Sequence, residues 1–149
     1  STVYCLAEAM PDVPPPLVVT YGVQTFQALQ NTSKVQIILS GGELDPRTGS
    51  LVGIVAQQTI ERFTLSCCIL STTALDHDTG TMEPTIEEVG MKHALANASD
   101  RVILAIDATK LSQRSAVRSV DLSEIDVIVT ELDTNDVRLD PYRELVELR

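Results

Sequence analysis

The chain has 149 residues, of which 44% are hydrophobic, so it can form one domain with a sizeable core and is not a disordered segment. With 3 tyrosines, 2 phenylalanines and no tryptophan, that core must be aliphatic. The net charge of −10 argues against a broad basic face for nucleic acid and against binding to an anionic membrane surface.

The cysteines Cys5, Cys67 and Cys68 are odd in number and lack the spacing of a metal site. We expect buried, reduced thiols in a cytoplasmic protein, with no metal and no cofactor. The sequence contains no signal peptide and no apolar run long enough to span a bilayer. Because the chain starts without methionine, on the helix-start pattern Ser1-Thr2, we expect it to be the later part of a longer protein.

In the first third of the chain, apolar residues spaced i, i+3, i+4 and i+7 predict an amphipathic helix over residues 3–10, capped by Ser1 or Thr2. The prolines of residues 11–16 end it. A short strand over residues 17–20 follows, and after Gly22 the spacing of apolar residues predicts a second helix.

The next stretch, residues 35–53, reads VQIILSGGELDPRTGSLVG. Residues 35–39 predict a strand buried on both faces. Gly41 and Gly42 allow a turn with positive φ and a close approach by another group, and residues 45–49 carry turn chemistry. Ser50 is a candidate N-cap for a helix over residues 51–63.

In the second half, apolar runs predict strands over residues 65–70, 102–106 and 125–130. Residues 76–80 read as a polar turn, and Thr85 with Glu88 forms a capping-box pattern for a helix that runs to about residue 98. Residues 141–148 are a final amphipathic helix or a tail. Strands that alternate with helices without alternating in polarity predict an α/β fold, an open, mostly parallel sheet with helices on both faces, in a single domain over residues 1–149.

Polar residues follow several of these strands, at the edge where a parallel sheet binds ligands. They are Thr20, Tyr21, Ser40, Gly41, Gly42, Ser71, Thr72, Thr73, Asp107 and Lys110. Each of these residues alone is explained by its position at the end of a strand, where polar residues are common. Together they predict a ligand-binding site. Lys92 and Lys110 are the candidates for holding an anionic group. The alternative for Lys92 is an exposed i, i+4 ion pair with Glu88, and His77 and His93 are expected at the surface.

The segment SGGELDPRTGSLVG resembles the GG…(T)SLxG signature of the effector domain of DeoR-type bacterial transcriptional regulators. Further family motifs follow in order. The initial ST resembles the family's G-[ST]-T loop, VVTY at 18–21 its VVTN strand end, EVGMK at 88–92 its E-x-x-V-K helix, DATKL at 107–111 its D-x-S-K-F segment, and LSEIDVIVTE at 122–131 its closing L-x-x-I-D-x-[IL]-I-T-D. The resemblance therefore covers residues 1–131.

The resemblance implies a fold like that of ribose-5-phosphate isomerase and coenzyme A transferases, a non-enzymatic homo-oligomer without membrane contact, and a phosphorylated sugar or sugar derivative as effector. DNA would be bound only through an N-terminal winged helix-turn-helix outside this chain. The effector-binding residues implied are Ser1, Thr2, Thr20, Tyr21, Gly41, Gly42, Ser50, Gly53, Glu88, Lys92, Asp107 and Lys110. The first two would offer backbone N–H groups to a phosphate, the two lysines would add charge, and Glu88 or Asp107 would accept hydroxyl hydrogen bonds or orient the lysines.

The sequence departs from the family pattern at three places. Tyr21 stands where the family has Asn, residues 71–74 replace a glycine-bearing segment, and Glu131 replaces Asp. Two alternatives stay open: a sugar-phosphate isomerase of the same fold, which needs a carboxylate base such as Glu88, Asp107 or Asp76, and an oligomerisation domain with a non-functional pocket. The acidic cluster expected of ribose-5-phosphate isomerases does not follow residues 65–70.

Overall fold

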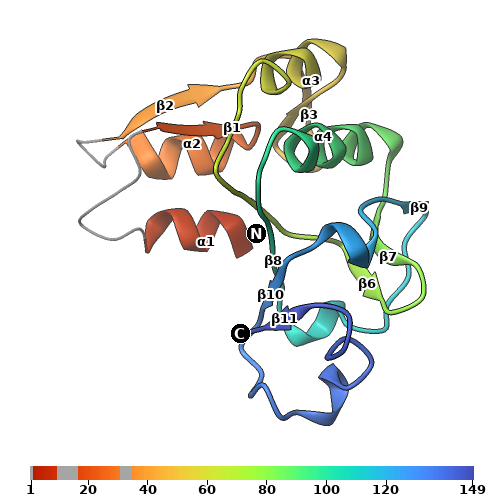
Figure 1. Cartoon of the computed structure of the whole chain (residues 1–149). Coiled ribbons are helices and arrows are strands. Elements are labelled where there is room, and N and C mark those ends of the chain that lie inside the picture. The colour runs from red at the N-terminus through yellow and green to blue at the C-terminus, as the bar shows by residue number, and fades with distance from the viewer. Residues whose placement is uncertain (1, 10–16, 31–34) are drawn as a thin grey trace.

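The computed structural model describes residues 2–9, 17–30 and 35–149. Its centre is a four-stranded parallel sheet in the order β11-β10-β8-β5, formed by Glu147–Leu148, Val127–Val129, Val102–Ala105 and Cys68–Leu70 (Figure 1). Strands β5, β8 and β10 are short and apolar, as the uninterrupted hydrophobic runs predicted, whereas β11 has two residues and was not predicted as a strand. The predicted α/β class with parallel strands is confirmed.

A second parallel sheet pairs β1 (Leu17–Thr20) with β2 (Gln36–Leu39). In Figure 1 this pair lies near α1 (Thr2–Glu8) and α2 (Val23–Gln30), which pack against each other. The prediction that residues 35–39 are buried on both faces is wrong. Gln36 is exposed and the rest of β2 is half-buried, because β2 pairs with β1 alone within the described part of the chain.

Short antiparallel strands account for the main departures from the predicted pattern. A hairpin joins β3 (Glu43–Asp45) to β4 (Ser50–Val52), and a three-stranded sheet contains β6 (Ala74–Asp76), β7 (Gly80–Glu83) and β9 (Val117–Arg118). The turns predicted at residues 45–49 and 76–80 are confirmed as the connections of the two hairpins. The flanking strands have two to four residues each, which is too short to produce a periodic signal.

The helix predicted over residues 51–63 is wrong at its start. Ser50 lies in strand β4 and caps nothing, and α3 (Ile54–Ile60) begins after Gly53, whose φ of 92° an L side chain rarely adopts. The later start changes which face is buried. Ile54 and Val55 are 65% and 57% exposed, and the buried positions are Ala56 and Ile60.

Helix α4 (Ile86–Asn97) follows the prediction closely. The Oγ1 atom of its N-cap, Thr85, accepts a hydrogen bond from the backbone N–H of Glu88 at 3.3 Å. The helix packs beside α3, and the two approach closely at Gly90, where a Cβ atom would lie 2.4 Å from the Gln57 amide nitrogen. Only glycine fits here without displacing that side chain.

Residues 141–148 form neither a helix nor a free tail. They turn and then supply β11 to the central sheet, where Tyr142 is 1% exposed and its hydroxyl lies 3.3 Å from the Leu75 carbonyl oxygen. The chain between β8 and β11 also contains three 3-10 helices: η1 (Ala108–Lys110), η2 (Leu122–Glu124) and η3 (Val137–Leu139). The core is aliphatic, as predicted.

The three cysteines are free thiols, but only Cys68 is buried. Cys5 and Cys67 are exposed, so the expectation that all three are buried is wrong. His77 and His93 lie at the surface, as expected. Among the described helices, none is both long enough and apolar enough to cross a membrane.

Candidate functional site

A buried ion pair lies beside the carboxyl end of β5. The Lys92 ammonium, on the inner face of α4, contacts Oε1 of Glu83 at the end of β7, and their side chains are 6% and 3% exposed. Lys92 Nζ also donates to the backbone carbonyl of Ser71. Such a pair persists in an apolar interior only when further hydrogen bonds satisfy both charges.

Those further bonds come from the loop that follows β5. The hydroxyl of Thr72 lies 2.8 Å from Glu83 Oε1, and that of Thr73 lies 3.2 Å from Glu83 Oε2. Thr72 is buried and Thr73 is exposed. Both oxygens of the Glu83 carboxylate are therefore held by Thr72 and Thr73, which lie in the segment 71–74 that departs from the glycine-bearing family pattern.

Glu88 extends this cluster toward β1. Its Oε2 atom lies 3.4 Å from the hydroxyl of Tyr21, which follows β1, and the residue is only 6% exposed. The carboxylate thus turns inward to Tyr21, and only the Thr85 half of the predicted capping box is observed. The exposed Glu88–Lys92 ion pair is wrong as well, because both residues are buried and Lys92 bonds Glu83.

Burial and neighbouring charges shift the pKa values of Lys92 and Tyr21. Burial lowers the pKa of Lys92 from its ordinary value, and the Glu83 and Glu88 carboxylates oppose that shift. Burial, reinforced by Glu88, raises the pKa of Tyr21 well above its ordinary value, so its hydroxyl stays a proton donor at neutral pH. We call Tyr21, Glu83, Glu88 and Lys92 the buried polar cluster.

The β3–β4 hairpin holds the backbone at Tyr21 in place. The backbone N–H of Leu51 donates to the Tyr21 carbonyl at 2.8 Å, and Ser50 forms a β-bridge with Gly22. A Cβ atom on Gly42 would lie 2.6 Å from the Val52 carbonyl oxygen, and its φ is +105°. The close approach predicted for this glycine is therefore confirmed, but the approaching group belongs to the chain itself.

The remaining strand-end residues of this region are bonded locally. Thr20 is buried and its Oγ1 accepts from the Gly22 N–H at 3.2 Å, and its carbonyl accepts from the N–H of Ser40 at 2.9 Å. Gly41 has a φ of +74° and open space where a Cβ atom would stand. The parallel register that pairs Thr20 with Leu39 brings these residues to one edge.

Asp107 and Lys110 follow β8, the neighbour of β5, at the same edge of the sheet. Asp107 caps η1 by accepting from the Thr109 backbone N–H at 2.9 Å, and the hydrogen bond from the Thr109 hydroxyl, together with this backbone bond, lowers the pKa of Asp107. Glu131, after β10, accepts from the Ala108 N–H at 2.9 Å. The Lys110 side chain is half-buried and makes no ion pair among the described residues.

The structure thus brings together part of the predicted site. Tyr21 and Glu88 contact each other, and Lys92 lies one turn further along α4 and bonds Glu83. Ser50 lies in the β3–β4 hairpin, and Gly53 follows that hairpin. Ser1 lies outside the described residues. Thr2 opens α1, and none of the hydrogen bonds within the described residues joins it to the buried polar cluster.

Sequence reasoning missed Glu83 and Arg47. Glu83 is nine residues from Lys92 and ends a strand that was not predicted, so no local spacing connects the two. Arg47 was read only as turn chemistry. Its guanidinium bonds Asp45 at 3.1 Å and is 68% exposed. The bond to Asp45 raises the pKa of Arg47, and the carboxylates of Glu87 and Glu88 add smaller contributions.

Asp76, His77 and Asp78 bring three ligand atoms within 4.8 Å of one another in the β6–β7 turn. Asp76 Oδ1 already accepts hydrogen bonds from the backbone N–H groups of Asp78 and Thr79, at 3.1 and 3.2 Å. This bonding is ordinary turn geometry, so the cluster gives no support for a metal site.

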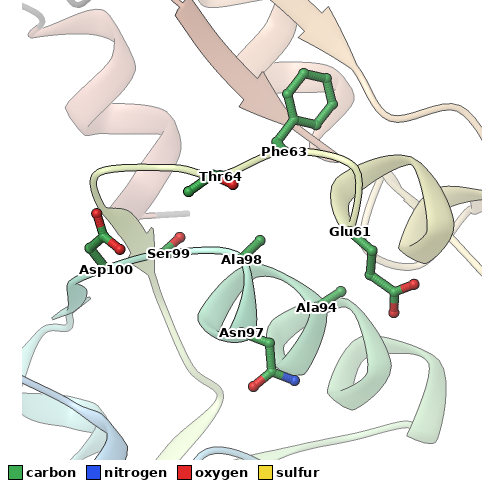
Figure 2. Close-up of a pocket in the computed structure, with 8 residues that line it drawn as sticks. All are labelled: Glu61, Phe63, Thr64, Ala94, Asn97, Ala98, Ser99 and Asp100. Carbon is green, nitrogen blue, oxygen red and sulfur yellow. The ribbon is translucent and has the colours of Figure 1, made fainter.

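A hollow of about 490 Å³ lies at the other edge of the sheet (Figure 2). It is formed where α3 and α4 end, before the chain enters β5 and β8. Its lining includes Glu61, Thr64, Asn97 and Asp100. It is separate from the strand ends that carry the predicted site, and it contains none of the predicted residues.

Comparison with known proteins gives a consistent result. A family model described as "DeoR C terminal sensor domain" matches residues 1–132. The chain is 36% identical over 101 residues to "HTH-type transcriptional regulator GlpR" of Haloferax volcanii. The aligned region covers 68% of this chain and 40% of that protein.

Two bacterial relatives extend the comparison. The chain is 28% identical over 136 residues to "L-fucose operon activator" of Haemophilus influenzae, covering 91% of this chain and 54% of that protein. It is 30% identical over 114 residues to "Glycerol-3-phosphate regulon repressor" of Escherichia coli, and the aligned region covers 76% of this chain and 45% of that protein. The chain spans about half the length of the curated relatives it matches.

Proposed function

This chain belongs to the family of DeoR C-terminal sensor domains, and from that premise we propose that it binds a phosphorylated sugar or sugar derivative and transmits the signal to a DNA-binding domain of a longer transcriptional regulator. The names of its relatives refer to a fucose operon and a glycerol-3-phosphate regulon. Both names fit a regulator of sugar-related metabolism. The proposed regulator is cytoplasmic and homo-oligomeric.

The observation that carries this proposal is that polar groups follow the carboxyl ends of strands in both parallel sheets. Tyr21 follows β1, the Ser71 carbonyl follows β5, and Lys110 follows β8. In open parallel sheets, ligands bind beyond the carboxyl ends of the strands. The relatives with regulatory names and these polar groups together support binding of a small effector.

Within the site we assign the phosphate to Lys110. In a domain with a net charge of −10, an anion needs a nearby cation that is not already neutralised. Lys92 is neutralised by Glu83 inside the fold, whereas the ammonium of Lys110 is free of ion pairs within residues 35–149. The predicted role of the Ser1 and Thr2 backbone N–H groups stays a prediction.

The part of the site next to Gly41 and Gly42 would contact the sugar end of the effector. Thr20, Tyr21, Gly41 and Gly42 lie beside one another there. Because the β3–β4 hairpin is bonded to Tyr21, a ligand that displaces Tyr21 would also shift the hairpin. Such a ligand would shift the equilibrium between two conformations of the sensor domain. This shift would change the affinity of the DNA-binding domain for DNA.

The test replaces Lys110 by alanine and titrates the protein calorimetrically with glycerol 3-phosphate, ribose 5-phosphate, fructose 1-phosphate and fructose 6-phosphate, and with their unphosphorylated parents. Loss of one charge-assisted hydrogen bond should weaken binding of the phosphorylated probe by about ten- to a hundredfold. The matched control is Arg114→Ala, which removes an exposed cation four residues downstream. Equal affinity of Lys110→Ala and wild type for a bound sugar phosphate would remove Lys110 from the site, and isomerisation of a probe would favour the enzyme alternative.

A further inference from the structure

The buried polar cluster contains one oxygen atom that is not hydrogen-bonded. Glu88 Oε1 is fully buried and has no hydrogen-bond partner among the described residues. The residue is 6% exposed, so bulk water does not solvate the carboxylate freely. A buried acceptor left unpaired is costly, and native proteins keep few of them.

The charges around this atom do not balance. Two carboxylates, Glu83 and Glu88, face one ammonium, Lys92, and Lys92 bonds Glu83. The Tyr21 hydroxyl reaches only the other oxygen of Glu88, at 3.4 Å, which is a long hydrogen bond. The guanidinium of Arg47 lies near Glu88 as well, but it is exposed and bonded to Asp45.

From these two observations we infer that Glu88 Oε1 is the specificity-determining acceptor for a neutral hydroxyl group of the effector, and that the effector lies with this hydroxyl at Glu88 and its phosphate away from it. This inference rests on the proposed function and adds the orientation and the chemistry of the ligand. A hydroxyl donates the missing hydrogen bond, whereas a phosphate next to an excess negative charge in an apolar setting is repelled.

The neighbouring groups explain how a ligand gains access. Tyr21 stays protonated, and among the described residues its hydroxyl makes only the long bond to Glu88, so the hydroxyl can move aside at little cost. Hydrogen bonds from residues 71–73 fix the Glu83–Lys92 pair, so this pair lies beside Glu88 without a net charge. A ligand that lacks the hydroxyl would leave the buried carboxylate unpaired, and sites built this way discriminate strongly against such analogues.

The first measurement uses the free protein. Glu88→Gln keeps the shape and removes the uncompensated charge, so we expect its Tm to rise by about 2–4 °C. Glu87→Gln is the matched control, since Glu87 is in the same first turn of α4 but exposed, and its Tm should not rise. A fall in the Tm of Glu88→Gln would show that the carboxylate serves the fold and would overturn the inference without any ligand.

The second measurement uses wild type and both variants with the sugar phosphates named above and with inorganic phosphate. For a sugar phosphate that binds wild type, Glu88→Gln should weaken binding about tenfold or more, because a charge-assisted hydrogen bond is lost. Glu87→Gln should stay within about twofold of wild type, as surface changes do. Inorganic phosphate should bind wild type and Glu88→Gln alike, because it contacts Lys110 and not Glu88.

The outcomes separate this inference from the proposed function. Equal binding of a sugar phosphate to wild type and Glu88→Gln, or much tighter phosphate binding to Glu88→Gln, overturns the inference and leaves the sugar-phosphate effector standing. Binding of only the unphosphorylated parents, still weakened in Glu88→Gln, overturns the phosphate assignment and supports the role of Glu88. Failure of every probe to bind wild type overturns both.

Discussion

Replacing Lys92 by alanine should destabilise the fold far more than replacing any surface lysine. The Lys92 side chain is 6% exposed and bonds both Glu83 and the Ser71 carbonyl. Its removal leaves Glu83 and Glu88 buried together without a compensating charge. Removing one partner of a buried ion pair costs about 3–5 kcal/mol, whereas ordinary surface substitutions stay within about 0.5 kcal/mol.

That loss is large against the whole stability of a domain of this size, which is about 5–15 kcal/mol. The free energy of unfolding is measured from urea denaturation followed by far-UV circular dichroism, at neutral pH and a single protein concentration. Lys110→Ala is the matched control, because it removes an ammonium that has no ion pair within the described residues. We expect it to lie within about 1 kcal/mol of wild type.

A double variant distinguishes uncompensated charge from lost packing. Glu83→Gln combined with Lys92→Met removes both charges, keeps an acceptor for Thr72 and fills the space of the lysine stem. It should recover at least half of the stability lost in Lys92→Ala, because neutral replacements of a buried pair are often well tolerated. A cost below about 1 kcal/mol for Lys92→Ala would refute the reasoning, since a buried unpaired carboxylate cannot be that cheap.

Three further outcomes are expected. Gly42→Ala should cost about 2 kcal/mol or more and Gly41→Ala about 1 kcal/mol in urea denaturation, because both have positive φ but only Gly42 meets a backbone oxygen; equal costs would contradict the close approach. A thiol reagent should modify Cys5 and Cys67 in the native protein and Cys68 only after unfolding, since burial hides Cys68 and raises its pKa; a native count of three would contradict this. The chain alone should not retard promoter DNA sequence-specifically at physiological salt, given its net charge of −10, and specific retardation would refute that expectation.

Local patterns predicted much of the architecture. Uninterrupted apolar runs located β1, β2, β5, β8 and β10, and the Thr85 cap located the start of α4. The short antiparallel strands were missed because two to four residues carry no period. Ser50 was misread because a serine after a glycine is as compatible with a strand as with an N-cap, and the pairing of β3 with β4 decides between them.

For the candidate site too, some features followed from the sequence and others only from the tertiary structure. The sequence alone determined that polar residues follow the parallel strands, and that Glu88 and Lys92 share one face of a helix. It could not determine which face, because α4 has apolar residues on several sides and its burial depends on the sheet and on α3. Only the tertiary structure turned that face inward and set Lys92 against Glu83, a contact between an unpredicted strand and a helix. The physical reason is that periodicity and capping record local geometry, whereas the burial and pairing of a charge depend on contacts between distant segments.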